Sequence, residues 1–198
     1  MRKLGILLGG ALALAACSST PRPVSPADLT NPLLAPGYLS MAASSDQFEI
    51  QSGQLAQTAS QNPAVQSMGQ MFVRDHTQST QMLMAAAAAA HVPAPPPTLL
   101  PQHQALLDQL RAAGTGQSFD VAFQQIQIQA HQQALALHQN YAASGDVPAL
   151  RATAGQIVPV VQTHLNALQS LQVAVAPPPP PPPPQMAPPP PRRAGERG

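Results

Sequence analysis

The chain has 198 residues, of which 9% are charged and 3% aromatic, with 25 prolines, one cysteine and no tryptophan. This length allows one ordinary domain with tails, and a single cysteine excludes an intramolecular disulfide framework or a metal site built from several cysteines. The formal net charge is +1 with no basic block outside the two ends, so we expect no nucleic-acid partner.

The N-terminal segment has the pattern of a bacterial lipoprotein signal. Two basic residues precede an apolar run that ends at Ala16 and is too short to span a bilayer. Residues 14–17 resemble the lipobox, in which Cys17 is diacylated and becomes the mature N-terminus. We therefore expect residues 1–16 to be removed as a signal peptide and Cys17 to anchor the protein in the membrane. Ser18 resembles lipoproteins of the outer membrane that face the periplasm; a plain signal peptide is the alternative.

Two proline-rich segments are predicted to flank the folded domain. Residues 17–35 contain Ser, Thr and Pro without apolar periodicity, which is typical of a flexible tether. Residues 174–198 include eight consecutive prolines and end in a basic tip, and eight prolines form a polyproline II rod of roughly 25 Å. We interpret this tail as a spacer. Contact with another protein or with an anionic envelope polymer is the alternative.

Residues 36–173 have helical periodicity and no useful strand pattern, with breaks at proline, glycine and asparagine. The predicted helices cover residues 36–60, 63–91, 118–143 and 148–173, with a short amphipathic turn over 102–113. Apolar and small residues recur at heptad spacing in the second and fourth helices. The pattern predicts an all-α fold, an up-and-down four-helix bundle. This domain contains three arginines and six acidic residues, so its net charge is negative and we expect it to repel polyanions.

An ordered set of residues in this domain carries a family resemblance: Glu49-Ile50, Gly53, Leu55-Ala56, Met71 to His76, Phe119-Asp120, His131, Pro159 and His164-Leu165. The set resembles the bacterial exported-protein family called domain of unknown function 4142. The resemblance implies a ferritin-like bundle, secreted or anchored in the envelope, without an established reaction. The chain departs from the family pattern at Phe123, where Tyr is common, and at Ala130, where Asp is usual.

Four ionisable side chains, one on each predicted helix, are the candidate metal ligands: Glu49, His76, His131 and His164. A ferritin-type di-iron site needs Glu-x-x-His on two helices, because two hard cations need about four carboxylates. The residues three positions before the histidines are valine or isoleucine, which argues against a di-iron oxidase. A mononuclear site of three histidines and one glutamate remains, and zinc, iron or copper suits it.

The same four side chains are also compatible with a structural role, as hydrogen bonds between helices. Asp75, Asp120 and His138 are candidates to support the ligands, although for His138 the sequence favours a surface position. We expect His91 and His103 to be solvated. The methionines are interpreted as core filler rather than copper(I) ligands.

The sequence favours a non-catalytic function, because no catalytic triad, phosphate-binding loop or nucleophilic cysteine is present. We expect a membrane-anchored envelope lipoprotein whose helical domain is a binding module or a structural, stress-related one. The alternative is a periplasmic mononuclear metal-binding or redox protein that uses the one glutamate and three histidines.

Overall fold

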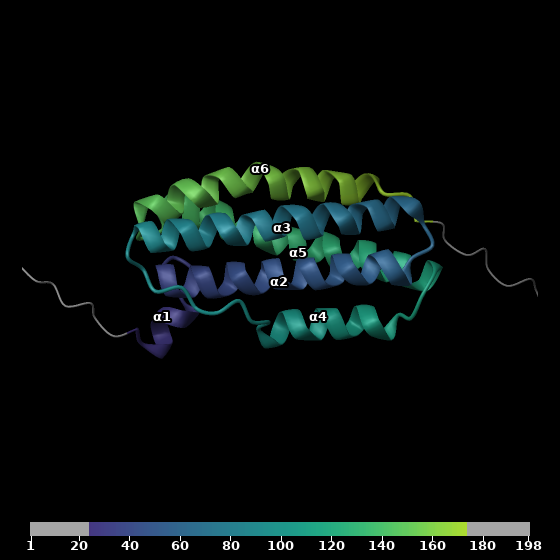
Figure 1. Ribbon diagram of the computed structural model, residues 1–198, viewed down its shortest axis with the longest axis horizontal. Coiled ribbons are helices and arrows are strands. Elements are labelled where there is room, and N and C mark those ends of the chain that lie inside the picture. The colour runs from purple at the N-terminus through teal and green to yellow at the C-terminus, as the bar shows by residue number, and fades with distance from the viewer. Residues whose placement is uncertain (1–23, 174–198) are drawn as a thin grey trace, which may run out of the picture.

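Four long helices run side by side in the computed structural model, which describes residues 24–173 (Figure 1). They are α2 (Ala35–Ala59), α3 (Pro63–Ala89), α5 (Gln117–Ser144) and α6 (Pro148–Ser170). Two shorter helices, α1 (Pro26–Thr30) and α4 (Pro101–Ala112), lie outside this bundle. The described residues contain no strand, so the predicted all-α class is confirmed. The predicted signal peptide, residues 17–23 with Cys17, and the whole proline-rich tail lie outside the described residues.

The helices form two antiparallel hairpins, α2 with α3 and α5 with α6, and α3 also packs on α6 while α2 packs on α5. The chain returns from the end of α3 along the outside of the bundle, and α4 lies in this crossover against α2 and α5. As a result α3 and α5 run in the same direction (Figure 1). The expected short turn over 102–113 is therefore a twelve-residue helix that covers one flank of the bundle.

Local sequence explains where the long helices begin and how they run. Pro63 and Pro148 occupy the first positions of α3 and α6, where the missing N–H costs nothing. Asn62 caps α3 by accepting a hydrogen bond from the backbone N–H of Ala64 at 2.9 Å. Pro159 lies inside α6. A proline has no N–H to donate to the carbonyl of the preceding turn, and α6 is bowed in Figure 1.

The hairpin of α2 and α3 is held at close range by two glycines. A Cβ atom on Gly53 would lie 2.6 Å from the carbonyl oxygen of Gly69, and one on Gly69 would lie 2.5 Å from the carbonyl oxygen of Gly53. These distances are far below van der Waals contact, so the two backbones touch only because neither residue has a side chain. The contact fixes the register of α2 against α3.

The bundle interior consists of two apolar clusters with a polar layer between them. One cluster is built around Phe48, Phe72 and Phe123, and the other around Tyr38 and Leu83. The buried polar side chains of the intervening layer come from all four long helices: Asp46, Glu49, Ser52, His76, Ser79, Gln127, His131 and His164. This layer contains the candidate ligands.

The structure differs from the expected tether in residues 24–35. Here α1 forms one helical turn with a capping box, in which Ser25 Oγ accepts from the N–H of Asp28 at 3.3 Å and Asp28 Oδ2 accepts from the N–H of Ser25 at 2.8 Å. This helix packs on α2, where Gly37 gives room for the carbonyl oxygen of Asn31. Local capping thus orders a segment that lacks apolar periodicity. None of the described helices has the length and hydropathy needed to cross a membrane.

Candidate metal centre

Three histidines from three helices meet in the polar layer: His76 from α3, His131 from α5 and His164 from α6. One ring nitrogen of each lies within 4.8 Å of the other two, and the ring centroids are 5.4–5.6 Å apart. The three residues are 3%, 1% and 1% exposed. Within residues 24–173, no other group of three or more His, Cys, Asp or Glu side chains has this arrangement.

Hydrogen bonds assign the tautomer of each ring. His76 Nδ1 lies 2.8 Å from Asp46 Oδ1, His131 Nδ1 lies 2.9 Å from the carbonyl oxygen of Gln127, and His164 Nε2 lies 2.9 Å from Asp75 Oδ2. All three partners are acceptors, so each of these nitrogens carries the N–H that it donates. The opposite nitrogens of neutral rings, His76 Nε2, His131 Nε2 and His164 Nδ1, are therefore free to donate a lone pair.

Two of these free nitrogens face each other. His131 Nε2 and His164 Nδ1 are 3.4 Å apart, and His76 Nε2 is buried without a hydrogen-bond partner. Two lone pairs at this distance repel each other unless a proton or a cation lies between them. A tetrahedral ion with Zn–N bonds of 2.0–2.1 Å separates its nitrogen ligands by about 3.3–3.4 Å, whereas a right-angled arrangement separates them by about 2.9 Å. The 3.4 Å between His131 Nε2 and His164 Nδ1 fits the tetrahedral case, and a nitrogen of His76 lies within 4.8 Å of the other two rings' ligand atoms.

The electrostatics differ among the three histidines. Burial lowers the pKa of His131 well below its ordinary value, and it also lowers the pKa of His164. Burial acts in the same direction on His76, but the hydrogen bond and charge of Asp46 outweigh it and raise the pKa of this histidine. His131 and His164 are thus neutral at neutral pH, and a metal ion would compete with a proton chiefly at His76.

Two carboxylates hold the histidines in place. Asp46, from α2, bonds His76 and also accepts a hydrogen bond from Thr80 Oγ1 at 3.0 Å. Asp75 bonds His164 and is itself held by Arg74 at 2.7 Å. Burial would raise the pKa of Asp75, but the hydrogen bonds from Arg74 and His164 lower it, so this residue is a carboxylate. Carboxylates bonded to the far nitrogen of a histidine are typical of metal sites, where they orient the ring.

The structure gives Glu49 a different place from the predicted fourth ligand. Its Oε1 atom lies 3.5 Å from His131 Nδ1, the nitrogen that points away from the other two histidines. Both carboxyl oxygens are buried without a hydrogen-bond partner, and burial raises the pKa of Glu49 to about 8. Glu49 is thus protonated at neutral pH and lies behind His131, so the structure brings together three histidines rather than three histidines and a glutamate.

The other predicted supporting residues lie away from the cluster, with the exception of Asp75. Asp120 is eleven residues before His131 on α5, which is about 16 Å along the helix axis. His138 is seven residues after His131, about 10 Å away along the axis. Asp46 was not predicted as a supporting residue. Its position one helical turn before Glu49 indicates that both side chains lie on the same face of α2.

Two histidines expected at the surface are buried. His138 is 2% exposed, and its Nδ1 accepts a hydrogen bond from Tyr38 Oη at 2.9 Å. Tyr38 also stacks on Tyr141, with ring centroids 3.7 Å apart. His103 is 7% exposed and bonds Ser44 Oγ at 2.6 Å, because α4 lays it against α2. Both expectations were wrong because they did not include the packing of α4 and α5 against α2.

The burial of His138 predicts a pH dependence of folding stability. Burial lowers its pKa to about 4, so between pH 6.5 and 4 the unfolded chain binds a proton that the folded chain does not. Stability therefore falls as the pH drops through this window, by up to about 1.4 kcal/mol per pH unit for one histidine. Urea unfolding of the metal-free protein at pH 7, 6 and 5 measures this slope. Replacing His138 with Gln should make it shallower, whereas replacing the exposed His91 with Gln should not.

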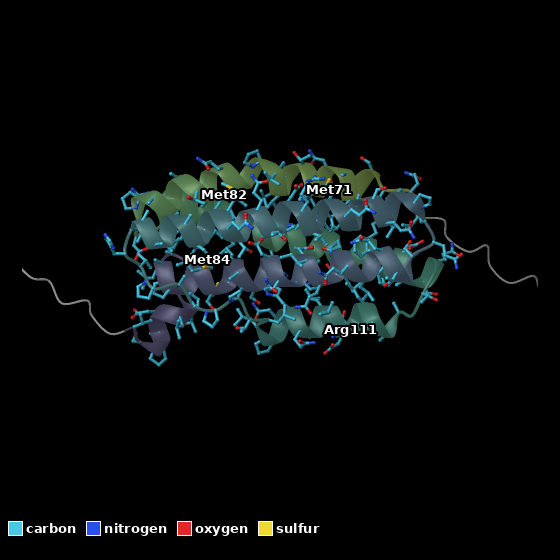
Figure 2. All side chains as sticks on the ribbon, viewed as in Figure 1. Met71, Met82, Met84 and Arg111 are labelled. Carbon is cyan, nitrogen blue, oxygen red and sulfur yellow. The ribbon has the colours of Figure 1, made fainter. Side chains whose placement is uncertain are left out.

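Within residues 24–173, the three labelled methionines of α3 do not gather at one place. Met71 and Met82 are eleven residues apart on α3, and Figure 2 shows both of them and Met84 at separate places along the bundle. Arg111, also labelled in Figure 2, lies on α4, where it forms an exposed ion pair with Asp108 at 3.0 Å that is separate from the methionines. The three-histidine cluster is thus the candidate metal centre of the described residues.

Comparisons with known proteins agree with this fold. A family model described as domain of unknown function (DUF4142) matches residues 20–171. A solved structure, "CopM in the Cu(II)-bound form", is similar with a TM-score of 0.58 and 18% sequence identity, over 69% of this chain and 94% of that chain. No curated protein matches the chain. Similarity at this level of identity shows a shared helical fold.

Proposed function

This chain belongs to the family described as domain of unknown function DUF4142, and we propose that its helical bundle binds one transition-metal ion through His76, His131 and His164. One observation carries the proposal. Each histidine donates a hydrogen bond from one nitrogen, one nitrogen of each ring lies within 4.8 Å of the other two, and the free nitrogens of His131 and His164 face each other in the buried layer. Buried lone pairs that face each other at 3.4 Å are costly without a cation, and a metal ion satisfies all three.

Zinc and copper are the favoured ions. Three imidazoles suit zinc, copper, iron and nickel, and the histidine spacing fits a tetrahedral ion such as zinc. The similar CopM structure is a copper(II)-bound form of that protein, which supports including copper. Copper(II) prefers a tetragonal arrangement, so its binding here would require the rings to move closer together.

The metal content of the full chain tests this function. The protein should be purified from the envelope in detergent, its metals counted by mass spectrometry, and zinc and copper then titrated into metal-free protein. We expect one equivalent per chain, lost in His131→Ala and His164→Ala and retained in His103→Ala, which removes a buried histidine outside the cluster. The absence of binding, or equal binding in all four proteins, would assign the cluster a hydrogen-bonding role in the core.

The carboxylate behind His164 should tune metal affinity without holding the fold together. Asp75 bonds His164 Nε2, and its side chain is 19% exposed. Asp75→Asn should weaken metal binding by about 10–100-fold, because an amide neither fixes the ring nor strengthens its basicity as a carboxylate does. Competition with a chromophoric chelator measures this change, with Asp108→Asn on α4 as the control. A change of less than twofold would remove Asp75 from the site.

We also propose that the bundle acts while anchored to the cell envelope, most simply at the periplasmic face of the outer membrane. Support comes from the lipobox-like residues 14–17 and from the short basic and apolar segments that precede Cys17. Labelled palmitate should be incorporated into the wild-type chain, and Cys17→Ser should move the protein from the membrane fraction to the soluble periplasm. Equal fractionation of both proteins would contradict lipid anchoring.

A further inference from the structure

A cavity of about 160 Å³ lies between α3 and α6, next to the histidine cluster. On α3 it is lined by residues that include Asp75, His76 and Ser79, and on α6 by residues that include Ile157 and Val160. His76 supplies one of the three free nitrogens, and Asp75 bonds the ring of His164. The cavity, here called the α3–α6 cavity, therefore adjoins one candidate ligand, His76, and the carboxylate that bonds a second one.

The α3–α6 cavity contains a buried polar group that no protein atom satisfies. Ser79 is 6% exposed, and its hydroxyl oxygen has no hydrogen-bond partner. Ser79 follows His76 by three residues, so the two side chains lie on the same face of α3. A buried polar atom without a partner is rare in proteins and points to an occupant that hydrogen-bonds with it.

Three protein ligands leave a tetrahedral ion with one open position, which in catalytic zinc sites holds water or a substrate. Glu49 does not fill this position, because it contacts the far nitrogen of His131. We propose, on the basis of the proposed function, that the fourth position opens into the α3–α6 cavity and accepts a small neutral ligand. The cavity belongs to the same size class as one of about 150 Å³ that holds benzene.

The walls favour a neutral ligand over an anion. Ile157, Val161 and Met82 make much of the lining apolar, and no lysine or arginine among the described residues lines the cavity to pair with an anion. An anion bound to the metal ion would have no second cationic partner against these walls, and burying incompletely paired charge is costly. A small uncharged molecule with one lone pair for the metal and one group for Ser79 fits this environment.

Cobalt(II) and imidazole provide the test, because tetrahedral cobalt(II) has visible bands that change when a ligand enters. The full chain is loaded with one cobalt(II), and imidazole is titrated at pH 8, where it is neutral, with azide as the anionic comparison. We expect imidazole to shift the bands and to bind more tightly than azide. Cobalt remaining on the protein after desalting shows that imidazole has not extracted it.

Two variants on α6 test whether the ligand reaches the metal through the α3–α6 cavity. Val160 is 40% exposed and lines the α3–α6 cavity, so Val160→Phe covers its mouth without entering the core. Val158→Phe makes the same change two residues away, outside the lining. Imidazole affinity should fall at least tenfold in the first variant and stay unchanged in the second.

Each outcome separates this inference from the proposed function. Failure to bind cobalt, zinc or copper would overturn the proposed function and the inference together. Cobalt bands that imidazole does not alter, or an imidazole affinity that Val160→Phe leaves unchanged, would overturn the inference while the metal site stands. Tighter binding of azide than of imidazole would overturn the proposed neutral ligand.

Discussion

Saturation with zinc should raise the thermal unfolding midpoint of the full chain, and His131→Ala should abolish this rise. A ligand that binds only the folded state at 100 times its dissociation constant adds about 2.7 kcal/mol, which for a domain of this size corresponds to roughly 5–11 °C. Alanine at position 131 removes one of the three facing lone pairs. The measurement is differential scanning calorimetry with zinc and with a chelator.

The comparison is made within each variant, so the stability that the alanine itself removes cancels. His103→Ala is the matched control, because it also deletes a buried, hydrogen-bonded histidine but lies on α4. This variant should unfold earlier than the wild type and still gain the same rise with zinc. An equal zinc-induced rise in His131→Ala would show that zinc binds elsewhere on the chain.

The second large effect concerns the contact between α2 and α3. Gly69→Ala should destabilise the fold by about 1–3 kcal/mol or more, because overpacking a tight interface forces the backbone to shift. The added Cβ would lie 2.5 Å from the carbonyl oxygen of Gly53 and 2.9 Å from the Cβ of Ala56. A backbone carbonyl inside a helix cannot move aside as a flexible side chain can. Urea unfolding of the metal-free protein gives the free energy directly.

Gly155→Ala is the control for this change, and it has the opposite expected sign. No atom lies within 4 Å of the position that its Cβ would take. Alanine inside a helix is favoured over glycine by about 0.5–1 kcal/mol, so this variant should be more stable than the wild type. If Gly69→Ala unfolded at the same urea concentration as the wild type, the close approach of α2 and α3 would be wrong.

The long helices were predictable because their signals are local. Prolines at the first positions and heptad spacing of apolar residues depend only on nearby sequence. The crossover through α4 was not predicted, because its course depends on which helices it covers. The order in α1 comes from a capping box rather than from apolar periodicity, so a search for periodic patterns missed it.

The site was predictable by residue type and helix, but not by register. The sequence placed one ionisable side chain on each helix, and the structure brings His76, His131 and His164 together. Whether Asp46 or Glu49 faces His76 depends on how far α2 slides along α3, and the contact between Gly53 and Gly69 sets this register. Such a contact joins two helices and has no local pattern.

The burial of His131 also depended on tertiary packing. Along its helix His131 lies off the apolar stripe that contains Phe123 and Leu137, on the side of the polar Gln124, yet the residue is 1% exposed. Helix α5 packs against α2, α4 and α6, so its buried face is wider than that of a helix with two neighbours. The wider face includes Gln127 and His138, both of which are fully or almost fully buried.

X-ray absorption spectroscopy of the full chain loaded with one zinc ion tests the central claim most directly, because it reports the ligands themselves. We expect nitrogen or oxygen neighbours at about 2.0–2.1 Å, with the multiple-scattering signature of three imidazoles. His164→Ala should lose one imidazole from this shell or lose the metal. A sulfur neighbour at about 2.3 Å, or a shell with no imidazole, would contradict the three-histidine centre.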